Sequence, residues 1–385
     1  MREKTKWTNI AKRKFSVSVI GISLLIGSCL VLSETTFAKK GVIVNPEDQT
    51  EIQSVIQEFL HGESQKQIET KEQIIEEAKE ILKRPDTSSM VKGMAEGIIK
   101  GEIKVPLKIN CSFNSSIENI ERVEKDKINV KVREDRTCTY DDGSNTSGIY
   151  PHLFGLVKKE KKWSIEKFED GSIVRGQLLT PEVKKLPPIP LPEETIKNQK
   201  IEEWRIKKEN VSTLSSSYTY NRNNAAWYGS YYAKNPNPSF RDFTSSGGDC
   251  TNFISQAVWY GNWPMVGWYP DKYSTSVWWY AFNWMGQSRT WTSAHYWWWF
   301  TYNRPRGYLT SNGCSLQKGD IVQRDGNPNP NGYIDHSLIV TDVRPGCNIR
   351  ISYHTPNTQD QSLWEFMGQY PNANFYGWRL YDSGN

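Results

Sequence analysis

The sequence predicts an α+β protein in two parts, and three observations support this prediction. Helical spacing of apolar residues comes first, alternating strand patterns follow, and a proline-rich segment then precedes a half that is rich in tryptophan. This segment, 186–192, contains alternating prolines that favour a stiff, extended linker. We therefore expect an N-terminal domain at 39–185, a linker with a charged connector helix at 186–215 and a C-terminal domain at 216–385.

Residues 1–38 have the pattern of a secretory signal peptide. Basic residues between Arg2 and Lys14 precede an apolar run at 15–32, and the small residues around Ala38 offer a cleavage point. The apolar run is long, so an uncleaved membrane anchor is the alternative. We expect a secreted, extracellular protein that contacts a membrane only through such an anchor.

The net charge of +5 comes from 48 basic and 43 acidic residues, which are spread along the chain after the N-terminus. A nucleic-acid-binding protein would concentrate its positive charge on one face or one segment. We therefore expect no nucleic-acid partner. A mildly basic secreted protein is compatible with an anionic cell wall.

The first half is predicted to begin with helices and to end in antiparallel strands. Apolar residues share one helical face at 52–59 and again at 74–81. The expected strands are 104–109, 128–132, 153–157 and 163–166, the last two joined by a Lys-Lys-Glu-Lys-Lys turn. Helices followed by a closing hairpin resemble the NTF2-like and cystatin-like folds. We expect a smaller α+β accessory domain of this kind.

The second half contains a cysteine in a favourable position for chemistry. Gly247 and Gly248 permit a sharp turn, Asp249 suits a helix N-cap, and a helix is predicted to begin at Cys250. The apolar residues at 253, 254, 257 and 258 form its buried face. Because free N–H groups and the helix dipole favour a thiolate, Cys250 is a candidate nucleophile.

The cysteine count supports a free thiol at this position. Cleavage after residue 38 would leave five cysteines, an odd number. If Cys111 pairs with Cys138, and Cys314 with Cys347, Cys250 remains alone. The alternative is that all five are ordinary thiols, because spacing alone does not fix disulfide connectivity.

Two histidines are candidate partners for the thiol. His336 lies in the predicted buried strand 333–341, and His354 ends the predicted strand 349–354. A turn at 344–346 makes these strands antiparallel neighbours, so both histidines would lie near one region of the sheet. A Cys–His–His constellation is therefore expected, with Asn357 as the alternative third member. The histidine spacing does not favour a metal site, and no metal or cofactor is expected.

Five short blocks in this half resemble a known family. They are Tyr220-Asn221-Arg222, the block from Gly247 to Phe253, the block from Lys318 to Val322, Asp335-His336-Ser337 and the block from Ser352 to Thr355. Together they resemble the family of Gram-positive bacteria described as "Putative amidase domain", over about residues 216–380. They are more distantly similar to the NlpC/P60 and CHAP cysteine peptidases, which have a papain-like fold.

The resemblance implies a role for each residue of the constellation. Cys250 would be the nucleophile, His336 the general base and His354 the group that orients His336. Asp249 and Thr251 match positions that can contact a peptide amine of the substrate. A tyrosine upstream of the cysteine, Tyr220 or Tyr228, would help to form the oxyanion hole.

The tryptophans between the cysteine and His336 allow two interpretations. Aromatic side chains can stack on sugar rings or peptides, but large side chains also fill the core of a small domain. The segment 277–284 has helical amphipathicity, which favours a core role for part of the set. We expect both uses.

The sequence therefore predicts a secreted cysteine hydrolase that forms an acyl-enzyme at Cys250 and cleaves amide bonds in cell-wall peptidoglycan peptides. One alternative is a non-catalytic cell-wall glycan- or peptide-binding protein that uses the tryptophan-rich segment. A second alternative is a transpeptidase or acyltransferase that uses the same residues. The sequence does not identify the bond that is cleaved.

Overall fold

A computed structural model describes residues 44–384, apart from 66–69, 86, 174–175, 178–179, 190–217, 283–285, 305 and 327–329. The predicted signal peptide at 1–38 and most of the predicted linker lie outside the described residues. Residues 42–385 form one compact unit. Among the described residues, no helix combines the length and the apolar character needed to cross a membrane.

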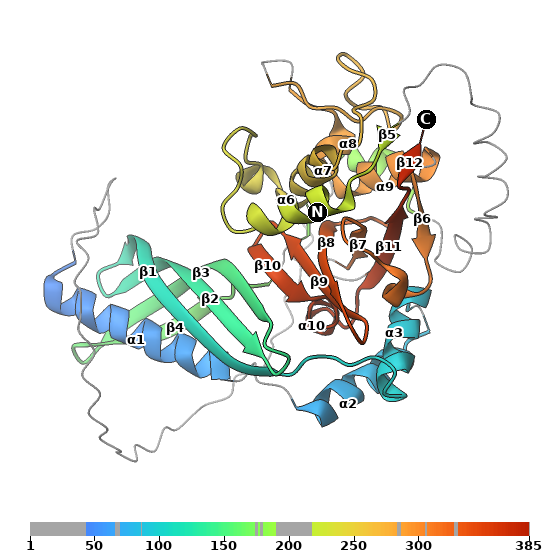
Figure 1. The fold of residues 1–385 in the computed structure, drawn as a ribbon. Helices are drawn as coiled ribbons and strands as arrows, with labels where there is room; N and C mark the ends of the chain where they lie inside the picture. The colour runs from blue at the N-terminus through green and yellow to red at the C-terminus, as the bar shows by residue number, and fades with distance from the viewer. Residues whose placement is uncertain are drawn as a thin grey trace, which may run out of the picture. The chain divides into compact units, whose positions relative to one another are not determined.

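The described residues form an α+β fold built on an antiparallel sheet (Figure 1). Ten strands follow the order β1-β2-β3-β10-β9-β8-β7-β11-β6, with β4 paired to β3, and β5 pairs with β12 separately. The strands are β1 (Lys108–Glu124), β2 (Lys127–Tyr140), β3 (Asn145–Lys159), β4 (Lys162–Glu169), β5 (Tyr218–Thr219), β6 (Gly307–Thr310), β7 (Ile321–Asp325), β8 (His336–Arg344), β9 (Asn348–Tyr353), β10 (Asn357–Ser362), β11 (Asn374–Leu380) and β12 (Ser383–Gly384). The helices are α1 (Pro46–Gln65), α2 (Lys71–Leu82), α3 (Ser89–Ile99), α6 (Arg222–Tyr231), α7 (Cys250–Tyr260), α8 (Arg289–Thr292), α9 (Ala294–Asn303) and α10 (Leu363–Gln369), and short 3₁₀ helices are η1 (Val183–Lys185), η2 (Thr244–Ser246) and η3 (Gly313–Ser315).

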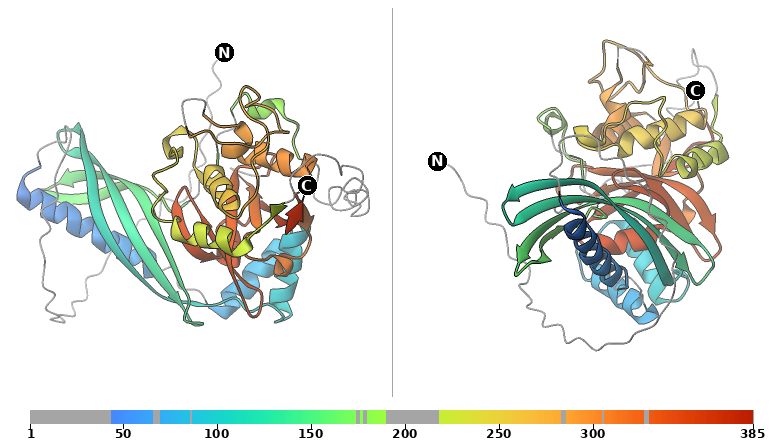
Figure 2. Two further views of the ribbon diagram at one scale, coloured as in Figure 1. Left: turned by 45° about the horizontal axis from the view of Figure 1, so that its top comes forward. Right: turned by 90° about the vertical axis from the view of Figure 1, so that its left-hand side faces the viewer.

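In the first half, α1 lies across the curved sheet of β1 to β4 (Figure 2). Its buried face, formed by Ile52, Ile56 and Leu60, joins a core with apolar side chains of the strands. The predicted hairpin of β3 and β4 is confirmed, and its two turn residues have positive φ angles of 49° and 70°. The predicted first strand is only partly correct, because β1 begins at Lys108.

Helices α2 and α3 do not join this core. Their buried residues, including Ala78 and Met94, pack with Val322 and Phe375 from β7 and β11 of the second half. Residues 147–149 of β3 also pair with 357–359 of β10. The structure therefore differs from the expected pair of independent domains. One sheet continues through both halves, because β3 is long enough to pair with β4 along one part and with β10 along another.

Two layers of helices cover the second half of the sheet (Figure 1). Helices α6, α7 and α9 lie on one face, which includes Ile339 of β8. Helices α2, α3 and α10 lie on the other face, with Leu338 and Val340. Because side chains alternate along a strand, the odd and even residues of β8 belong to different cores.

Most of the tryptophan-rich segment is core. Trp263, Trp278, Trp291, Trp297 and Trp298 are at most 1% exposed, whereas Trp268 is 69% exposed. The expected helix at 277–284 is wrong for the described residues 277–282, which form isolated bridges at Trp278 and Tyr280. Trp278 therefore packs into the core from extended backbone, whereas Trp291 lies in α8 and Trp297 and Trp298 lie in α9.

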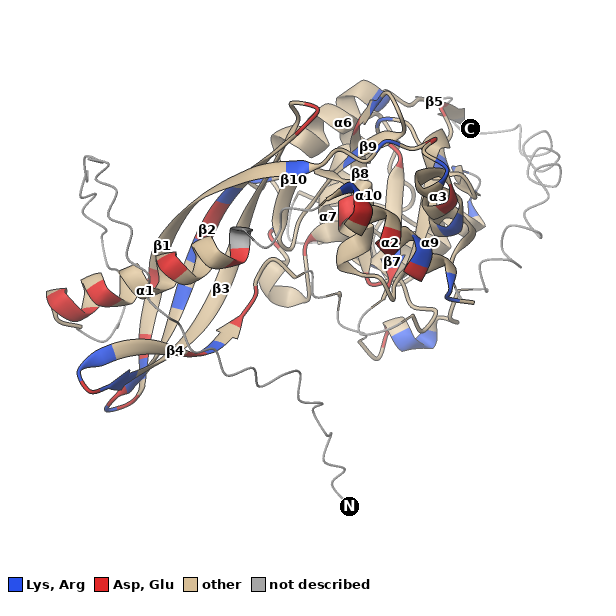
Figure 3. Cartoon of the chain, turned by 90° about the horizontal axis from the view of Figure 1, so that it is seen from below, with Lys and Arg blue, Asp and Glu red and all other residues tan. Residues whose placement is uncertain are grey.

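The disulfide pairing that leaves Cys250 alone is confirmed. Cys111 pairs with Cys138 between β1 and β2, and Cys314 of η3 pairs with Cys347 in the turn between β8 and β9. Cys250 is a free, buried thiol. Lys and Arg lie among Asp and Glu on β2, whereas α1 carries acidic side chains and neither Lys nor Arg (Figure 3).

Candidate active site

The predicted helix start at Cys250 is confirmed. Gly247 and Gly248 have φ angles of 109° and 115°, a left-handed conformation that favours glycine, and α7 begins directly after Asp249. Phe253, Ile254 and the other apolar residues of the predicted face are fully buried. The two glycines and the apolar face thus place Cys250 in the first turn of a buried helix.

Asp249 occupies the N-cap position of α7, but its carboxylate does not cap the helix. One oxygen accepts the Phe243 N–H at 3.0 Å and the Asn252 side-chain amide at 2.8 Å, and the other lies 2.6 Å from Nδ1 of His354. The expected capping bond is therefore wrong. Asp249 has φ −102° and ψ 0° rather than the extended conformation that aims an N-cap side chain at the helix.

His354 contacts α7 through two groups. Its Nδ1 meets Asp249, and its ring stacks on Phe253 with centroids 4.0 Å apart. Its Nε2 lies 2.9 Å from the carbonyl oxygen of Tyr232, which follows α6. Both ring nitrogens face acceptors, and only the doubly protonated ring can donate to both. Asn357, the alternative third member, instead donates its amide to the carbonyl of Lys234.

The Cys250 thiol is 1% exposed. Its Sγ lies 3.7 Å from the Thr251 hydroxyl, and the Ser337 backbone N–H is a further hydrogen-bond donor to it. Burial nevertheless raises the pKa of the thiol to about 11. The expectation of a thiolate at Cys250 is therefore wrong for this arrangement. Burial raises the pKa of the thiol by more than the helix N-terminus and the two hydrogen-bond donors lower it.

His336 is the first residue of β8, which begins three residues after the start of the predicted strand, and its side chain packs on the opposite face of the sheet from α7. Its ring lies against Tyr353 and against Phe366 of α10, with centroids 5.3 Å and 5.9 Å apart. The next residue, Ser337, is the one that faces α7, through its hydroxyl 3.3 Å from Thr251 Oγ1. Nε2 of His336 has no hydrogen-bond partner among the described residues.

The environment of His336 disfavours its charged form. Burial lowers its pKa well below the ordinary value, and the nearby Arg324 guanidinium acts in the same direction. The structure thus brings His354, but not His336, to the start of α7. Their catalytic roles remain predictions.

The other predicted site residues are already engaged. Thr251 is fully buried between Cys250 and Ser337. Tyr220 donates its hydroxyl to the carbonyl of Gly319, and Tyr228 donates to Gln256. In this arrangement neither tyrosine hydroxyl is directed at an oxyanion.

Three residues that contact the start of α7 were not predicted from the sequence. Ser337 acts through its backbone N–H, which has no side-chain signature, and Asn252 links Asp249 to Trp291 through its amide. Gln177, from the first half, bonds to Gly248. Asn252 could have been predicted as a site residue, because it lies two residues after Cys250 in the same block. No pattern in the sequence links Gln177 to that block.

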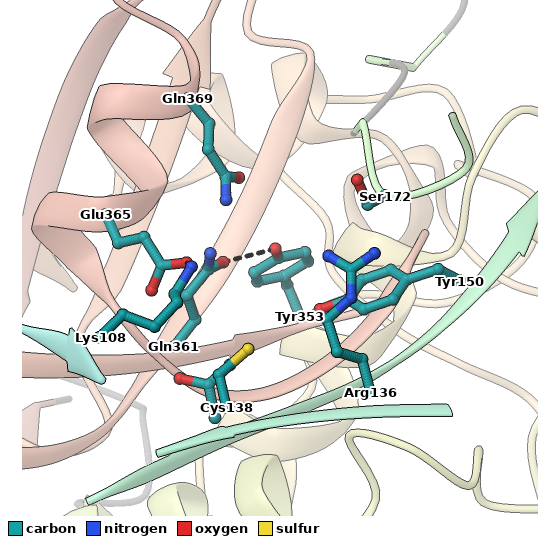
Figure 4. Close-up of a pocket in the computed structure, with 10 residues that line it drawn as sticks. Lys108, Arg136, Cys138, Tyr150, Ser172, Tyr353, Gln361, Glu365 and Gln369 are labelled. Atoms are coloured by element: carbon teal, nitrogen blue, oxygen red, sulfur yellow. Dashed lines mark hydrogen bonds and ion pairs between the residues drawn. The ribbon is translucent and has the colours of Figure 1, made fainter. Parts of the chain in front are cut away.

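A separate polar cavity lies between β1 to β3 and α10 (Figure 4). It has about 40 Å³ of free space for water-sized molecules, which is too small for a peptide. Lys108 bonds to Glu365 at 2.6 Å and Arg136 holds Glu134 through two 2.7 Å bonds, so both cations that line it are neutralised. Among the described residues, no cluster of three or more His, Cys, Asp or Glu could hold a metal ion.

Comparison with known families finds one match, in the second half of the chain. Residues 219–378 match the model of the family described as "Putative amidase domain". This is the family that the five sequence blocks resemble. The match indicates a hydrolase of amide bonds and runs from the second residue of β5 into β11. No curated protein and no solved structure matches the chain significantly.

Proposed function

We propose that the amidase domain is a cysteine hydrolase that cleaves amide bonds through an acyl-enzyme at Cys250. The observation that carries the proposal is the position of this free thiol, in the first turn of α7, within the segment that matches an amidase family. The N–H groups of a helix start are suited to stabilise the oxyanion of a tetrahedral intermediate. The Ser337 N–H, which is directed at Sγ, is a further donor in the same place.

The reaction would proceed in two steps. The Cys250 sulfur attacks the carbonyl carbon as its proton passes to an imidazole, and the same imidazolium then protonates the leaving nitrogen as the C–N bond breaks. Water attacks the resulting thioester, giving a carboxylic acid and restoring the thiol. Because the pKa of the buried thiol is about 11, the described arrangement is a resting state in which the sulfur is protonated.

His354 is the better supported of the two candidate bases. It lies on the face of the sheet that carries α7 and is held by Asp249, the residue before the nucleophile. To accept the thiol proton, its Nε2 would have to leave the Tyr232 carbonyl and carry no hydrogen of its own. His336 requires a larger change, because its ring is packed among apolar side chains on the other face.

We further propose that the substrate is a peptide of the cell-wall peptidoglycan and that the protein is exported. The basic N-terminus followed by an apolar run and the two disulfides support export, because disulfides persist in oxidising compartments. Export places the enzyme beside the wall, where peptide amides are abundant. The buried tryptophans weaken the alternative of a binding protein that uses the whole aromatic segment.

The test is incubation with purified muropeptides followed by mass spectrometry of the products. A new carboxyl group at one amide supports hydrolysis, and transfer to an amine acceptor would instead identify an acyltransferase. The variant Cys250→Ala should abolish product formation, whereas Lys79→Met, which changes an exposed side chain of α2, serves as the folded control. Full activity of Cys250→Ala would overturn the proposal.

A further inference from the structure

A segment of the first half crosses the start of α7. We define the strap as the described residues 176–177 and 180–189, which follow β4 in the chain. The side chain of Gln177 reaches Gly248, two residues before Cys250. Its backbone N–H donates to the carbonyl of Asp335 at 2.7 Å, directly before His336. The strap thus connects the start of α7 with the start of β8.

The Gln177 carboxamide is fully matched by three backbone groups. Its Nε2 donates to the carbonyls of Gly248 at 3.3 Å and Thr292 at 2.8 Å. Its Oε1 accepts the N–H of Ala294, the first residue of α9, at 2.7 Å. Two acceptors and one donor are the complement of a primary carboxamide, which has two N–H hydrogens and one carbonyl oxygen.

The fit also excludes other side chains of similar size. A carboxylate would place an oxygen against the carbonyls of Gly248 and Thr292, and an N-substituted amide would lack one of the two hydrogens. The side-chain stem of Gln177 lies close to Gly248, where an added Cβ would come within 3.4 Å of its Cγ. Without a carboxamide, the three backbone groups would lose their partner, which is costly where they are partly buried.

The strap is anchored a second time at α9. The Pro187 carbonyl accepts from Nε2 of His295 at 3.0 Å and from the Trp299 indole at 3.1 Å. Nδ1 of His295 accepts the Ile334 N–H, so the neutral ring satisfies both contacts, and burial lowers its pKa to about 4. The anchor therefore does not depend on the carboxamide of Gln177.

We propose that Gly248, Thr292 and Ala294 form a substrate subsite for a primary carboxamide, which Gln177 occupies as an internal substrate mimic in the resting enzyme. This inference rests on the proposed function, because it assigns the subsite to peptides cleaved at Cys250. The preferred substrate is a peptide that carries an unsubstituted carboxamide close to the cleaved bond. Gln177 leaves the subsite when such a peptide binds, and until then it limits access to the thiol.

The binding test uses the full chain with Cys250→Ala, so that it does not depend on hydrolysis. The probes are acetyl-Ala-Gln-methylamide, its Glu counterpart and its N5-methyl-Gln counterpart, titrated by calorimetry. With Gln177→Ala added, the Gln peptide should bind at least about tenfold more tightly than either counterpart. With Gln177 intact, its binding should be weaker by a similar factor. Equal binding of all three peptides, or binding of none, would overturn the subsite.

A second measurement keeps the test independent of one variant. Gln177→Glu keeps the shape but repels the two carbonyls, so it should open the subsite as Gln177→Ala does. In chains that retain Cys250, both variants should raise the rate of alkylation by iodoacetamide by about tenfold. The matched control is Gln53→Ala, which removes a carboxamide that donates to the backbone carbonyl of Ser115 under α1. Unchanged alkylation in both Gln177 variants would contradict the blocking role, whatever the outcome of the muropeptide assay.

Discussion

Nδ1 of His354 lies 2.6 Å from a carboxylate oxygen of Asp249, and this contact joins the end of β9 to the residue before Cys250. Both side chains are at most 2% exposed. A buried charge that loses its partner is left without compensation, so the contact should tie the start of α7 to the sheet. The same contact holds the imidazole against the residue that precedes the candidate nucleophile.

Asp249→Asn and His354→Gln should each destabilise the protein, by about 2 to 4 kcal/mol in the free energy of unfolding, because each leaves a buried polar partner. The double variant should cost less than the sum of the two, by about 1 kcal/mol or more. Urea denaturation of the four proteins measures this coupling. Additive losses would show that the two side chains do not interact in solution.

The thiol of Cys250 should remain protonated at neutral pH. Since burial raises its pKa from 9.0 to about 11, alkylation by iodoacetamide should accelerate up to about pH 11 without a plateau near pH 7. In the unfolded chain the thiol loses its proton at a lower pH than in the folded protein. The free energy of unfolding should therefore fall as the pH rises from about 9 to 11, by about 2 to 3 kcal/mol in total. The Cys250→Ala variant has no thiol to titrate, so its free energy of unfolding should not show this fall with pH. A plateau of alkylation near pH 7 would contradict the pKa shift.

His336 should contribute little to stability, because its Nε2 is buried without a partner among the described residues. We expect His336→Phe to change the free energy of unfolding by less than about 1 kcal/mol, since the ring keeps its contacts with Tyr353 and Phe366. Product formation from muropeptides should then distinguish the two histidines. If His354 is the base, His336→Phe retains activity and His354→Gln loses it. The reverse result would restore the base role that the sequence predicted for His336.

Local patterns predicted the elements of the site well. The two glycines, Asp249 and the apolar spacing located the start of α7, and the turn after Arg344 located the hairpin of β8 and β9. These features depend on neighbours in the chain, and the physical preferences of a few residues determine them.

The arrangement of the side chains could not be predicted in the same way. Whether His336 or Ser337 faces α7 depends on the phase of β8 relative to the two helix layers, and both residues are buried in one hydrophobic run. The raised pKa of Cys250 depends on total burial, which no local pattern reports. Gln177 reaches the site from 71 residues away in the chain.

The free thiol provides a direct check of the disulfide pairing. Titration with a thiol reagent in denaturant, without reductant, should find one reactive cysteine in the chain from residue 39 onward, namely Cys250. Replacing Cys314 and Cys347 by Ser opens a loop of 33 residues, so the free energy of unfolding should fall by about 3 to 4 kcal/mol. Titration of more than one thiol would disprove the pairing.

The buried pair of Lys108 and Glu365 should couple the two halves of the chain. Lys108 begins β1, and Glu365 lies in α10 beside the second half of the sheet. Burial alone would raise the pKa of Glu365, but Lys108 and the Tyr140 hydroxyl hold it below its ordinary value of 4.5. The stabilisation is therefore present above about pH 4.5 and should be lost as the pH falls through the lowered pKa.

Lys108→Met should remove this stabilisation and leave Glu365 buried without its cation, at a cost of about 3 kcal/mol at pH 7. The loss should shrink at acid pH, because Glu365 without its cation is protonated more readily than in the native pair. Urea denaturation at pH 7 and pH 3.5 measures the difference, with Lys79→Met, which removes an exposed partner of Glu76, as the matched control. If the halves fold as separate domains, Lys108→Met should split the unfolding transition in two, whereas one sheet that spans both should unfold in a single step.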